Sequence, residues 1–172
     1  EGYEFEINPK IGEWMRQAYG AIDIGFIITI DYGYTAEELR SHEKTHGTLQ
    51  THYNHTTERN PYLRIGRQDI TAHVNFSDLL TEGSAVGLRT IGIVTQSEFL
   101  HRLGFAQLFS TIDQLRIHSS EKSENKMAMR ELVNPDGLGK FKVLVQEKGT
   151  CVSHLDEITP SLHGTTQCQE YS

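Results

Sequence analysis

Apolar residues recur at helical spacing near the start of the chain and then give way to a short run that is nearly all apolar. Behind Asn8 as N-cap and Pro9 as first helical residue, the spacing predicts a helix whose apolar face carries Ile11, Trp14, Met15, Ala18 and Ile22. Residues 26–30 follow as a β-branched run, which is typical of a strand buried on both faces of a parallel sheet. A helix that leads into such a strand indicates an α/β fold.

The middle of the chain continues with helical and strand patterns. Apolar residues over 79–86 recur at helical spacing and predict a helix that begins at Ser77 or Asp78. Residues 91–94 predict a brief strand, and two further helices are expected on either side of Gly104.

The last third of the chain is more polar. Residues 118–126 are expected to be exposed, and residues 127–133 predict a short helix or turn. The alternation over 140–147 predicts the closing strand. Residues 150–172 have little periodicity and predict a poorly ordered tail, so we expect a single folded unit over residues 1–149.

The segment from Asp69 to Phe76 alternates between polar and apolar residues and predicts a strand. One face of that strand would carry Ile70, Ala72, Val74 and Phe76, and the other Asp69, Thr71, His73 and Asn75. A wholly polar face suits either an ordinary solvated sheet surface or the lining of a polar pocket. The pattern alone leaves both interpretations open.

A second candidate site follows the predicted strand at 26–30, where the chain reads Asp31-Tyr32-Gly33. In open α/β sheets, ligands bind beyond the carboxyl ends of the strands. An acidic residue there, followed by a glycine that permits close backbone approach, suits a ligand site and equally suits an ordinary strand-to-loop turn.

Histidine and cysteine offer weaker signals. His42 and His46 are four residues apart, a spacing that can hold a metal on a helix, but the stretch lacks the His-Glu-x-x-His order and any apolar helical stripe. We therefore expect solvated loop histidines and no metal site. Cys151 and Cys168 come too late in the chain to complete a zinc site, and free thiols are favoured over a bridge.

Charge and missing motifs narrow the function. The formal net charge of −7 argues against general binding to nucleic acid or to anionic membranes. No apolar run reaches the ~20 residues that cross a bilayer. The chain contains neither a Gly-x-Ser-x-Gly nucleophile turn nor a Gly-x-Gly-x-x-Gly loop after a strand. It begins at Glu1 without Met, so we expect either a processed chain or a piece of a longer protein.

Several motifs together carry a resemblance to a known family. In order, they are Asp31-Tyr-Gly33, Gly47-Thr-Leu49 with His55, Gly66-Arg-Gln-Asp-Ile-Thr-Ala-His-Val-Asn-Phe76, Gln96-Ser-Glu-Phe-Leu100, and Met129 to Pro135. With this order and spacing over residues 1–149, the chain resembles the second half of MidA-like S-adenosylmethionine-dependent methyltransferases, relatives of the mitochondrial complex I assembly factor that methylates arginine.

The resemblance implies a class I, Rossmann-like methyltransferase fold, S-adenosylmethionine as methyl donor, and a protein side chain such as arginine as substrate. It also implies that this chain is the C-terminal half of the domain, because the family's glycine-rich cofactor loop lies in the first half and is not in this sequence. On that basis the chain alone is expected to be inactive and cytoplasmic.

Site residues follow from the resemblance and from the polar alternation. Carboxylates must orient an arginine and accept its proton, and we take Asp31 and Asp69 as candidates, with His73 orienting Asp69 or relaying a proton. Substrate contacts are expected from Tyr32, Gly33, Gln68, Thr71 and Asn75. The cofactor-binding residues cannot be named from this chain.

A second function class stays open. A half-domain with an exposed sheet edge is also suited to be a non-enzymatic binding or assembly module. A metal-dependent hydrolase is a distant third, because it would need a metal site that the sequence does not predict.

Overall fold

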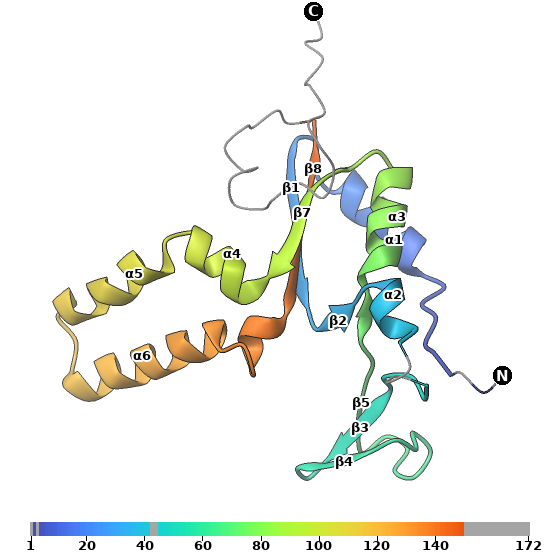
Figure 1. Cartoon of the computed structure of the whole chain (residues 1–172), viewed down its shortest axis with the longest axis horizontal. Coiled ribbons are helices and arrows are strands. Elements are labelled where there is room, and N and C mark those ends of the chain that lie inside the picture. The colour runs from blue at the N-terminus through green and yellow to red at the C-terminus, as the bar shows by residue number, and fades with distance from the viewer. Residues whose placement is uncertain (1, 3, 42–44, 150–172) are drawn as a thin grey trace, which may run out of the picture.

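The chain folds around a three-stranded sheet in the order β1-β8-β7 (Figure 1). The computed structural model describes residues 2, 4–41 and 45–149. The strands are β1 Gly25–Asp31, β7 Arg89–Thr95 and β8 Lys142–Lys148. β8 is antiparallel to both neighbours, so β1 and β7 run in the same direction. The predicted closing strand is therefore confirmed, but it lies in the middle of this sheet.

One face of the sheet is covered by the helices α1 Ile11–Gly20 and α3 Phe76–Ala85 (Figure 1). The core on this side consists of Met15, Phe76, Leu79, Leu88 and Leu144, all at most 5% exposed. Full burial of each such side chain stabilises the fold by about 1.5–3 kcal/mol. Both helices were predicted from their apolar spacing, and Met15 lies at the centre of the expected face of α1.

The opposite face of the sheet is only partly covered. Its core is formed by Ile91, Val94, Val143 and Val145, with Phe99 of α4 (Gln96–Arg102) packed against it. The register places Ile28 opposite Val145 and Ile30 opposite Val143, yet Ile28 and Ile30 are 51% and 48% exposed. The expectation that residues 26–30 are buried on both faces is therefore wrong, because β1 is an edge strand in the part of the chain described here.

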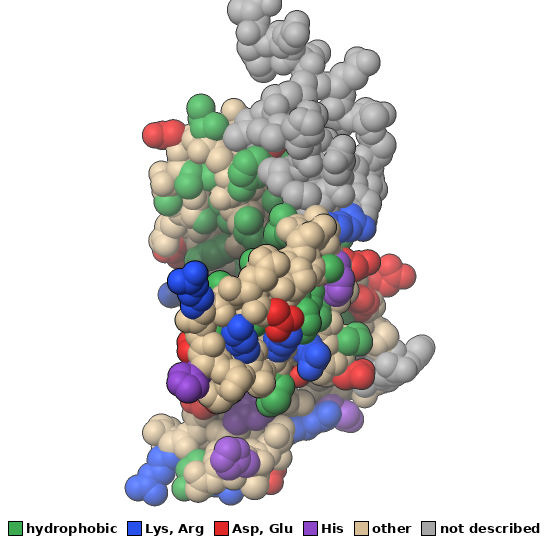
Figure 2. Space-filling model, turned by 90° about the vertical axis from the view of Figure 1, so that its left-hand side faces the viewer, with side chains coloured by type: hydrophobic (Ala, Val, Ile, Leu, Met, Phe, Trp, Pro, Cys, Tyr) green, Lys and Arg blue, Asp and Glu red, His purple; other side chains and the backbone are tan. Residues whose placement is uncertain are grey.

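From α4 onward the chain forms a projecting helical arm (Figure 1). It consists of α4, α5 Phe105–Thr111, the 3-10 turns η2 Ile112–Gln114 and η3 Leu138–Lys140, and α6 Ser119–Val133. Residues 118–126 were predicted to be exposed, and residues 127–133 were predicted as a short helix or turn. No residue of α6 is buried, which agrees with the expected exposure, and the expected short helix is the second half of one helix of 15 residues. Lys126 and Arg130 of α6 lie over the Phe109 ring. The Lys and Arg side chains of the arm alternate with apolar ones on the face seen in Figure 2.

A small lobe lies below the main sheet (Figure 1). Its strands are β3 Gln50–Tyr53, β4 Thr56–Glu58 and β5 Asp69–Thr71, in the order β4-β3-β5. Between lobe and sheet, β2 Gly33–Tyr34 pairs in parallel with β6 Val74–Asn75, and the short helix α2 Ala36–Leu39 follows β2. We call residues 50–71 the lobe.

The predicted strand over residues 69–76 is not formed as one strand. β5 and β6 belong to different sheets, the chain is irregular at Ala72 and His73, and Phe76 begins α3. The His73 backbone N–H donates to Thr48 Oγ1 at 2.9 Å, so it is not used in a β-ladder. The two faces expected from the alternation therefore do not exist over the whole segment.

Some predictions fall outside the described residues. His42, Cys151, Cys168 and the expected tail over 150–172 lie there, so the boundary after residue 149 stays a prediction. No helix within residues 4–41 and 45–149 is both long and apolar enough to span a membrane.

Candidate functional site

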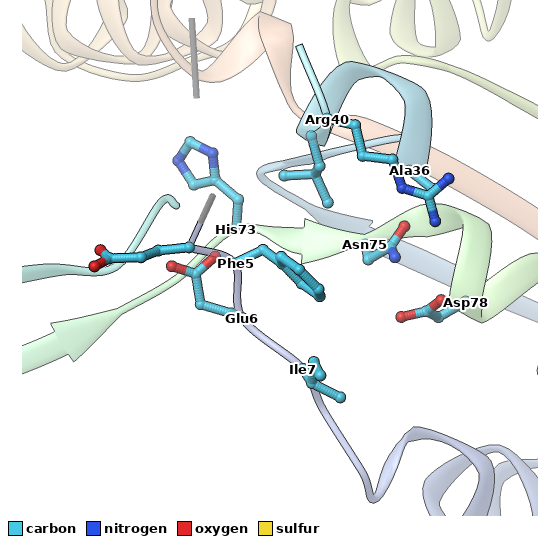
Figure 3. Close-up of a pocket in the computed structure, with 10 residues that line it drawn as sticks. Phe5, Glu6, Ile7, Ala36, Arg40, His73, Asn75 and Asp78 are labelled. Atoms are coloured by element: carbon cyan, nitrogen blue, oxygen red, sulfur yellow. The ribbon is translucent and has the colours of Figure 1, made fainter. Parts of the chain in front are cut away.

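A cavity of about 500 Å³ lies where the extended segment 4–7 passes the short helix α2 and the start of α3 (Figure 3). Residues from three separate stretches of the chain line it, namely Glu4, Phe5, Glu6, Ile7, Ala36, Leu39, Arg40, His73, Asn75 and Asp78. Two of these, His73 and Asn75, are predicted site residues. The cavity combines an apolar wall with several ionisable groups, which is the usual composition of a ligand site.

The parallel pair β2–β6 brings the two predicted site segments together. The Val74 backbone N–H donates to the Tyr32 carbonyl at 3.1 Å, and Gly33 pairs with Val74. A Cβ atom at Gly33 would overlap the Val74 carbonyl oxygen, so only glycine permits this approach. Tyr32 and Gly33 therefore lie beside His73 and Asn75, as the sequence predicted for one site.

The carboxylate of Glu6 is held by the turn that follows Gly47. It accepts hydrogen bonds from the backbone N–H groups of Thr48 at 2.8 Å and Leu49 at 2.7 Å, and from Thr48 Oγ1 at 3.0 Å. Partial burial opposes ionisation of Glu6, but the backbone and side-chain donors outweigh it and lower the pKa of Glu6 below its usual value. Gly47 has φ +67°, and a Cβ there would meet the Glu6 carboxylate.

Thr48 links this fixed carboxylate to His73. Its Oγ1 donates to Glu6 Oε2 and accepts from the His73 backbone N–H. The His73 ring lies against two aromatic rings, with centroid distances of 5.3 Å to Tyr32 and 5.0 Å to Tyr34. Backbone and ring of His73 are thus both positioned, as a side chain in a reactive site has to be.

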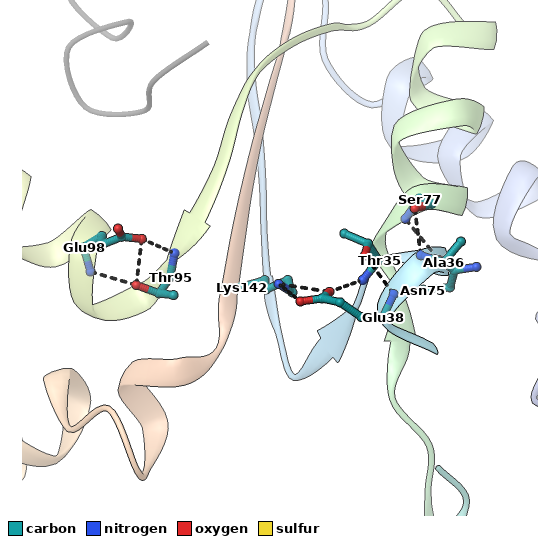
Figure 4. A network of polar contacts seen from close by, with 8 residues as sticks. All are labelled: Thr35, Ala36, Glu38, Asn75, Ser77, Thr95, Glu98 and Lys142. Atoms are coloured by element: carbon teal, nitrogen blue, oxygen red, sulfur yellow. Dashed lines mark hydrogen bonds and ion pairs between the residues drawn. The ribbon is translucent and has the colours of Figure 1, made fainter. Parts of the chain in front are cut away.

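Asn75 has a structural task in addition to lining the cavity. Its Oδ1 accepts from the Ser77 backbone N–H at 3.1 Å and caps α3, and Ser77 Oγ accepts from the Ala36 N–H at 2.9 Å (Figure 4). The predicted caps, Ser77 and Asp78, are therefore the second and third residues of the helix, and Asn75 is the N-cap. Asp78 lies in the first turn of α3 and lines the cavity.

Asp31 lies at the carboxyl end of β1, opposite Lys142 of β8. Its Oδ1 accepts from the Tyr32 backbone N–H at 2.8 Å. Lys142 forms an ion pair with Glu38 at 3.4 Å, and this pair connects the end of the main sheet to α2 (Figure 4). Asp31 is thus near the site segments along the chain but is not among the residues that line the cavity.

Gln68, Asp69 and Thr71 lie elsewhere, on the lobe. Gln68 and Asp69 line a separate polar cavity of about 350 Å³, together with His52, Tyr53, Asn54, Gly66 and Arg67. Thr71 Oγ1 lies 3.2 Å from His52 Nε2, and Gln68 Nε2 donates to the Pro61 carbonyl at 2.6 Å. Because the strand that would have joined them is interrupted, His73 and Asn75 line one cavity and Gln68 and Asp69 another. The other predicted site residues line neither of these two cavities.

The sequence did not single out Glu6, Thr48, Arg40 or Asp78. A signal existed for Thr48, since it is the centre of the Gly47-Thr-Leu49 motif. The only pattern around Glu6 is the short alternation of polar and apolar residues over 4–7, and this pattern was not interpreted as part of a site. Within the described part of the chain, no group of three His, Cys, Asp or Glu side chains could hold a metal ion.

Comparison with protein families identifies the chain. Residues 1–94, more than half of it, match the family described as "Putative S-adenosyl-L-methionine-dependent methyltransferase". The chain belongs to this methyltransferase family. No curated protein is similar enough to the chain to count as a match.

Two solved structures from Burkholderia thailandensis resemble this methyltransferase family member. Each has a TM-score of 0.77, and each match covers 93% of the chain described here. One is an uncharacterised superfamily protein with 26% identity. The other is a member of the same superfamily with 28% identity, inferred to be a methyl transferase and bound to S-adenosyl-homocysteine. These likenesses agree with the class I methyltransferase fold. The chain spans 42% and 41% of the two neighbours' lengths.

S-adenosylmethionine is the cofactor of this family, and its fit to the described residues is incomplete. A nucleotide-like cofactor needs a glycine-rich turn with open backbone N–H groups at a helix N-terminus. The turns that lead from strands into α2, α3 and α4 are instead capped by Thr35, Asn75 and Thr95. Thr35 and Thr95 form matching capping boxes with Glu38 and Glu98 (Figure 4). The principal cofactor cradle is therefore not formed by the described residues.

Proposed function

We propose that the chain is the substrate-side part of a MidA-type methyltransferase that methylates an arginine side chain of a protein. The observation that carries the proposal is the cavity between segment 4–7, α2 and α3, in a chain of the methyltransferase family. Among the described residues, three carboxylates line that cavity, from Glu4, Glu6 and Asp78, together with one guanidinium, from Arg40. The excess of negative charge favours a cationic guest.

Arginine suits this lining because its guanidinium stays charged in water and forms hydrogen bonds with carboxylates in a fixed plane. Glu6 supplies a fixed negative charge, since the three donors around it favour the ionised form. Asp78 is the carboxylate we propose to accept hydrogen bonds from the bound guanidinium. Phe5 and Ile7 would cover the aliphatic stem of the substrate side chain.

A guanidinium nitrogen that gains a methyl group must lose a proton. S-adenosylmethionine, the cofactor of this family, would supply the methyl group when bound, and its sulfur would keep the electron pair of the broken sulfur–carbon bond. We propose that His73 holds or moves this proton at a ring nitrogen, in the position fixed by Thr48, Tyr32 and Tyr34. The rings of Tyr32 and Tyr34 would also exclude water. Asp31 and Asp69 stay candidate carboxylates, and Gln68 and Thr71 candidate substrate contacts, now proposed for the lobe side of the substrate.

We further propose that the donor-binding part of the fold attaches along β1. The outer edge of β1 has no strand beside it among the described residues, and Ile28 and Ile30 expose an apolar face there. The solved neighbours are more than twice as long as this chain, which leaves room for such a part. On this proposal the chain alone binds S-adenosylmethionine weakly and is inactive, and the protein works in the cytoplasm.

The same edge supports the second function class, a binding or assembly module without catalysis. An unpaired edge strand is a template for pairing with another chain. Isothermal titration of the full chain with S-adenosylmethionine tests the fragment proposal, and tight binding by this chain alone would contradict it.

The arginine site is tested by binding, which does not require catalysis. The ligands are the peptide Gly-Arg-Gly and its citrulline analogue, which has the same shape but no charge. We expect the full chain to bind the arginine peptide about tenfold more tightly, a difference of about 1.4 kcal/mol. Asp78→Asn should remove most of that preference, whereas Asp136→Asn on the distant turn after α6 should leave it unchanged. Equal affinities for the two peptides in the unmodified chain would exclude the proposed arginine site.

A further inference from the structure

One stretch of the lobe is basic in an otherwise acidic chain. Residues 59–67, Arg59-Asn-Pro-Tyr-Leu-Arg-Ile-Gly-Arg67, contain three arginines and no acidic residue, whereas the whole chain has a formal net charge of −7. We call residues 59–67 the ridge. It lies between β4 and β5, and Figure 2 shows Lys, Arg and His side chains near the bottom of the molecule, where the lobe lies.

The ridge also exposes large apolar side chains. Tyr62 is 78% exposed, Leu63 58% and Ile65 78%. Soluble proteins seldom group such side chains on one exposed segment unless the segment contacts something. Tyrosine and arginine are also the residue types most enriched where proteins bind each other.

Local bonds, and not burial, hold the ridge in shape. Asn60 Oδ1 accepts from the Tyr62 N–H at 3.0 Å, and the Arg64 carbonyl accepts from the Arg67 N–H at 2.9 Å. The Arg64 guanidinium lies 4.7 Å from the centre of the Tyr53 ring, and Gln68 bonds to the Pro61 carbonyl. A segment that is ordered in advance loses less entropy on binding than a flexible one.

The ridge is joined to the proposed arginine cavity by a continuous surface. Arg59 and Pro61 line an open cavity together with His46, Leu49 and residues 4–7. Residues 4–7 line the arginine cavity as well, so they form a wall common to both (Figure 3). On that wall Phe5 and Ile7 are 68% and 74% exposed, so it offers apolar side chains next to Arg59 and Pro61 of the ridge.

We infer that the ridge is a docking surface for an acidic and apolar segment of the protein substrate, close to the methylated arginine. Three cations with no acid among them favour a negatively charged partner, and Tyr62, Leu63 and Ile65 favour apolar side chains within it. The inference rests on the proposed function for the identity of the partner as substrate. The docking itself does not depend on the cavity.

Docking is measured with a fluorescein-labelled peptide that contains no arginine, Glu-Leu-Glu-Phe-Glu-Leu, against the full chain. The matched control is Gln-Leu-Gln-Phe-Gln-Leu, which keeps the apolar residues and removes the side-chain charges. We expect the acidic peptide to bind at least tenfold more tightly in fluorescence anisotropy, and its affinity to fall as salt is raised. Equal binding of the two peptides would overturn the inference.

Variants locate the binding surface. Arg59→Glu combined with Arg67→Glu should weaken the acidic peptide about tenfold or more, and Ile65→Ser about threefold. These side chains are exposed, so the variants should fold with unchanged circular dichroism and unfolding midpoint. Arg116→Glu, an exposed arginine on the helical arm, is the charge control and should leave affinity unchanged. An equal loss from Arg116→Glu would show general electrostatic attraction and would overturn the inference.

Two further measurements separate the alternatives. Vesicles of phosphatidylcholine and phosphatidylserine should not bind the chain, and binding to them that is lost in the double arginine variant would assign the ridge to lipid and overturn the inference. The citrulline comparison described above reports on the arginine cavity alone. If the arginine and citrulline peptides bind equally but the acidic peptide still docks, the proposed function is rejected and the docking surface stays. If the arginine peptide is preferred but the acidic peptide does not dock, only the docking surface is rejected.

Discussion

The main sheet and the lobe are both three-stranded, and they differ in what their side chains do. In the main sheet, β8 has five consecutive buried residues, Val143 to Glu147, with a helix layer against one face. In the lobe, β3 has a single buried residue, Thr51, and β4 has none. The same type of pairing thus serves stability in one region and the display of surface chemistry in the other.

The two regions are connected at few points, and the candidate cavity lies at these points. Gly33 against Val74 connects the end of β1 to the chain that leaves the lobe. Glu6, through Thr48, connects the N-terminal segment to the chain that enters the lobe. A site built at such a junction can be affected from either side, which makes the comparison testable.

The largest effect is expected from emptying the core of the main sheet. Phe76 is fully buried, so Phe76→Ala should lower the free energy of unfolding by about 3–5 kcal/mol. Tyr62→Ala in the lobe removes an aromatic ring that is 78% exposed and should change it by less than about 0.5 kcal/mol. Urea unfolding measures both, and similar losses would mean that the lobe is part of the core.

A smaller effect is expected at the junction. Gly33→Ala forces a Cβ into the Val74 carbonyl and should cost about 1–3 kcal/mol, because the flanking strands must move apart. Gly20→Ala at the end of α1 meets open space and should stabilise the chain by about 0.4–1 kcal/mol. The same unfolding assay applies, and a neutral Gly33→Ala would show that β2 and β6 separate freely.

The smallest effect concerns pH. The pKa of Glu6 is below its usual value in the folded chain, so its hydrogen bonds stabilise the fold above that usual value and the stabilisation is lost as pH falls through the lower folded pKa. Glu38 and Glu98 have lowered pKa values too, through their capping threonines, and shift stability in the same direction. Unfolding midpoints should therefore fall as pH is lowered through the range in which these three carboxylates become protonated.

Glu6→Gln isolates the contribution of the Glu6 carboxylate and its hydrogen bonds to Thr48 and Leu49. The variant should be less stable than the unmodified chain at pH 7, and the difference should shrink as pH falls through the lowered pKa of Glu6, because the unmodified chain then loses the same charge. Glu121→Gln on the exposed face of α6 is the control and should show no such convergence. A constant difference between Glu6→Gln and the unmodified chain at every pH would mean that the Glu6 charge is not used.

The sequence predicted the main sheet better than the lobe, for a physical reason. Helix α1, helix α3 and strands β1, β7 and β8 bury apolar residues, and burial imposes a period on the sequence. Helix α6 has no buried residue, so its polar first half carried no such period and was expected only as exposed chain. Whether a strand lies at the edge or in the centre of its sheet also leaves little trace in the sequence, which is why β1 was expected to be covered on both faces.

The candidate site was predicted in part, and its division was not. Tyr32, Gly33, His73 and Asn75 come together because β2 and β6 pair. Asp69 and Thr71 were placed with His73 and Asn75 through an alternation that runs smoothly across Ala72 and His73, and Gln68 was added with the family resemblance. A side-chain hydroxyl 25 positions away, Thr48 Oγ1, takes the His73 N–H and ends that regularity. Local pattern cannot reveal a bond to so distant a residue.

The central place of β8 also governs the order in which the chain can assemble. Among the described residues, β1 and β7 do not pair with each other, and each is joined to this sheet through residues 142–148. A ribosome that has made residues 1–141 has therefore produced two strands that cannot yet pair. Contacts of such long sequence separation slow folding, and they leave apolar strands exposed to chaperones until β8 emerges. Strand β8 thus joins β1 and β7 only after both have been made, and a translation stall before residue 142 should leave this three-stranded sheet open.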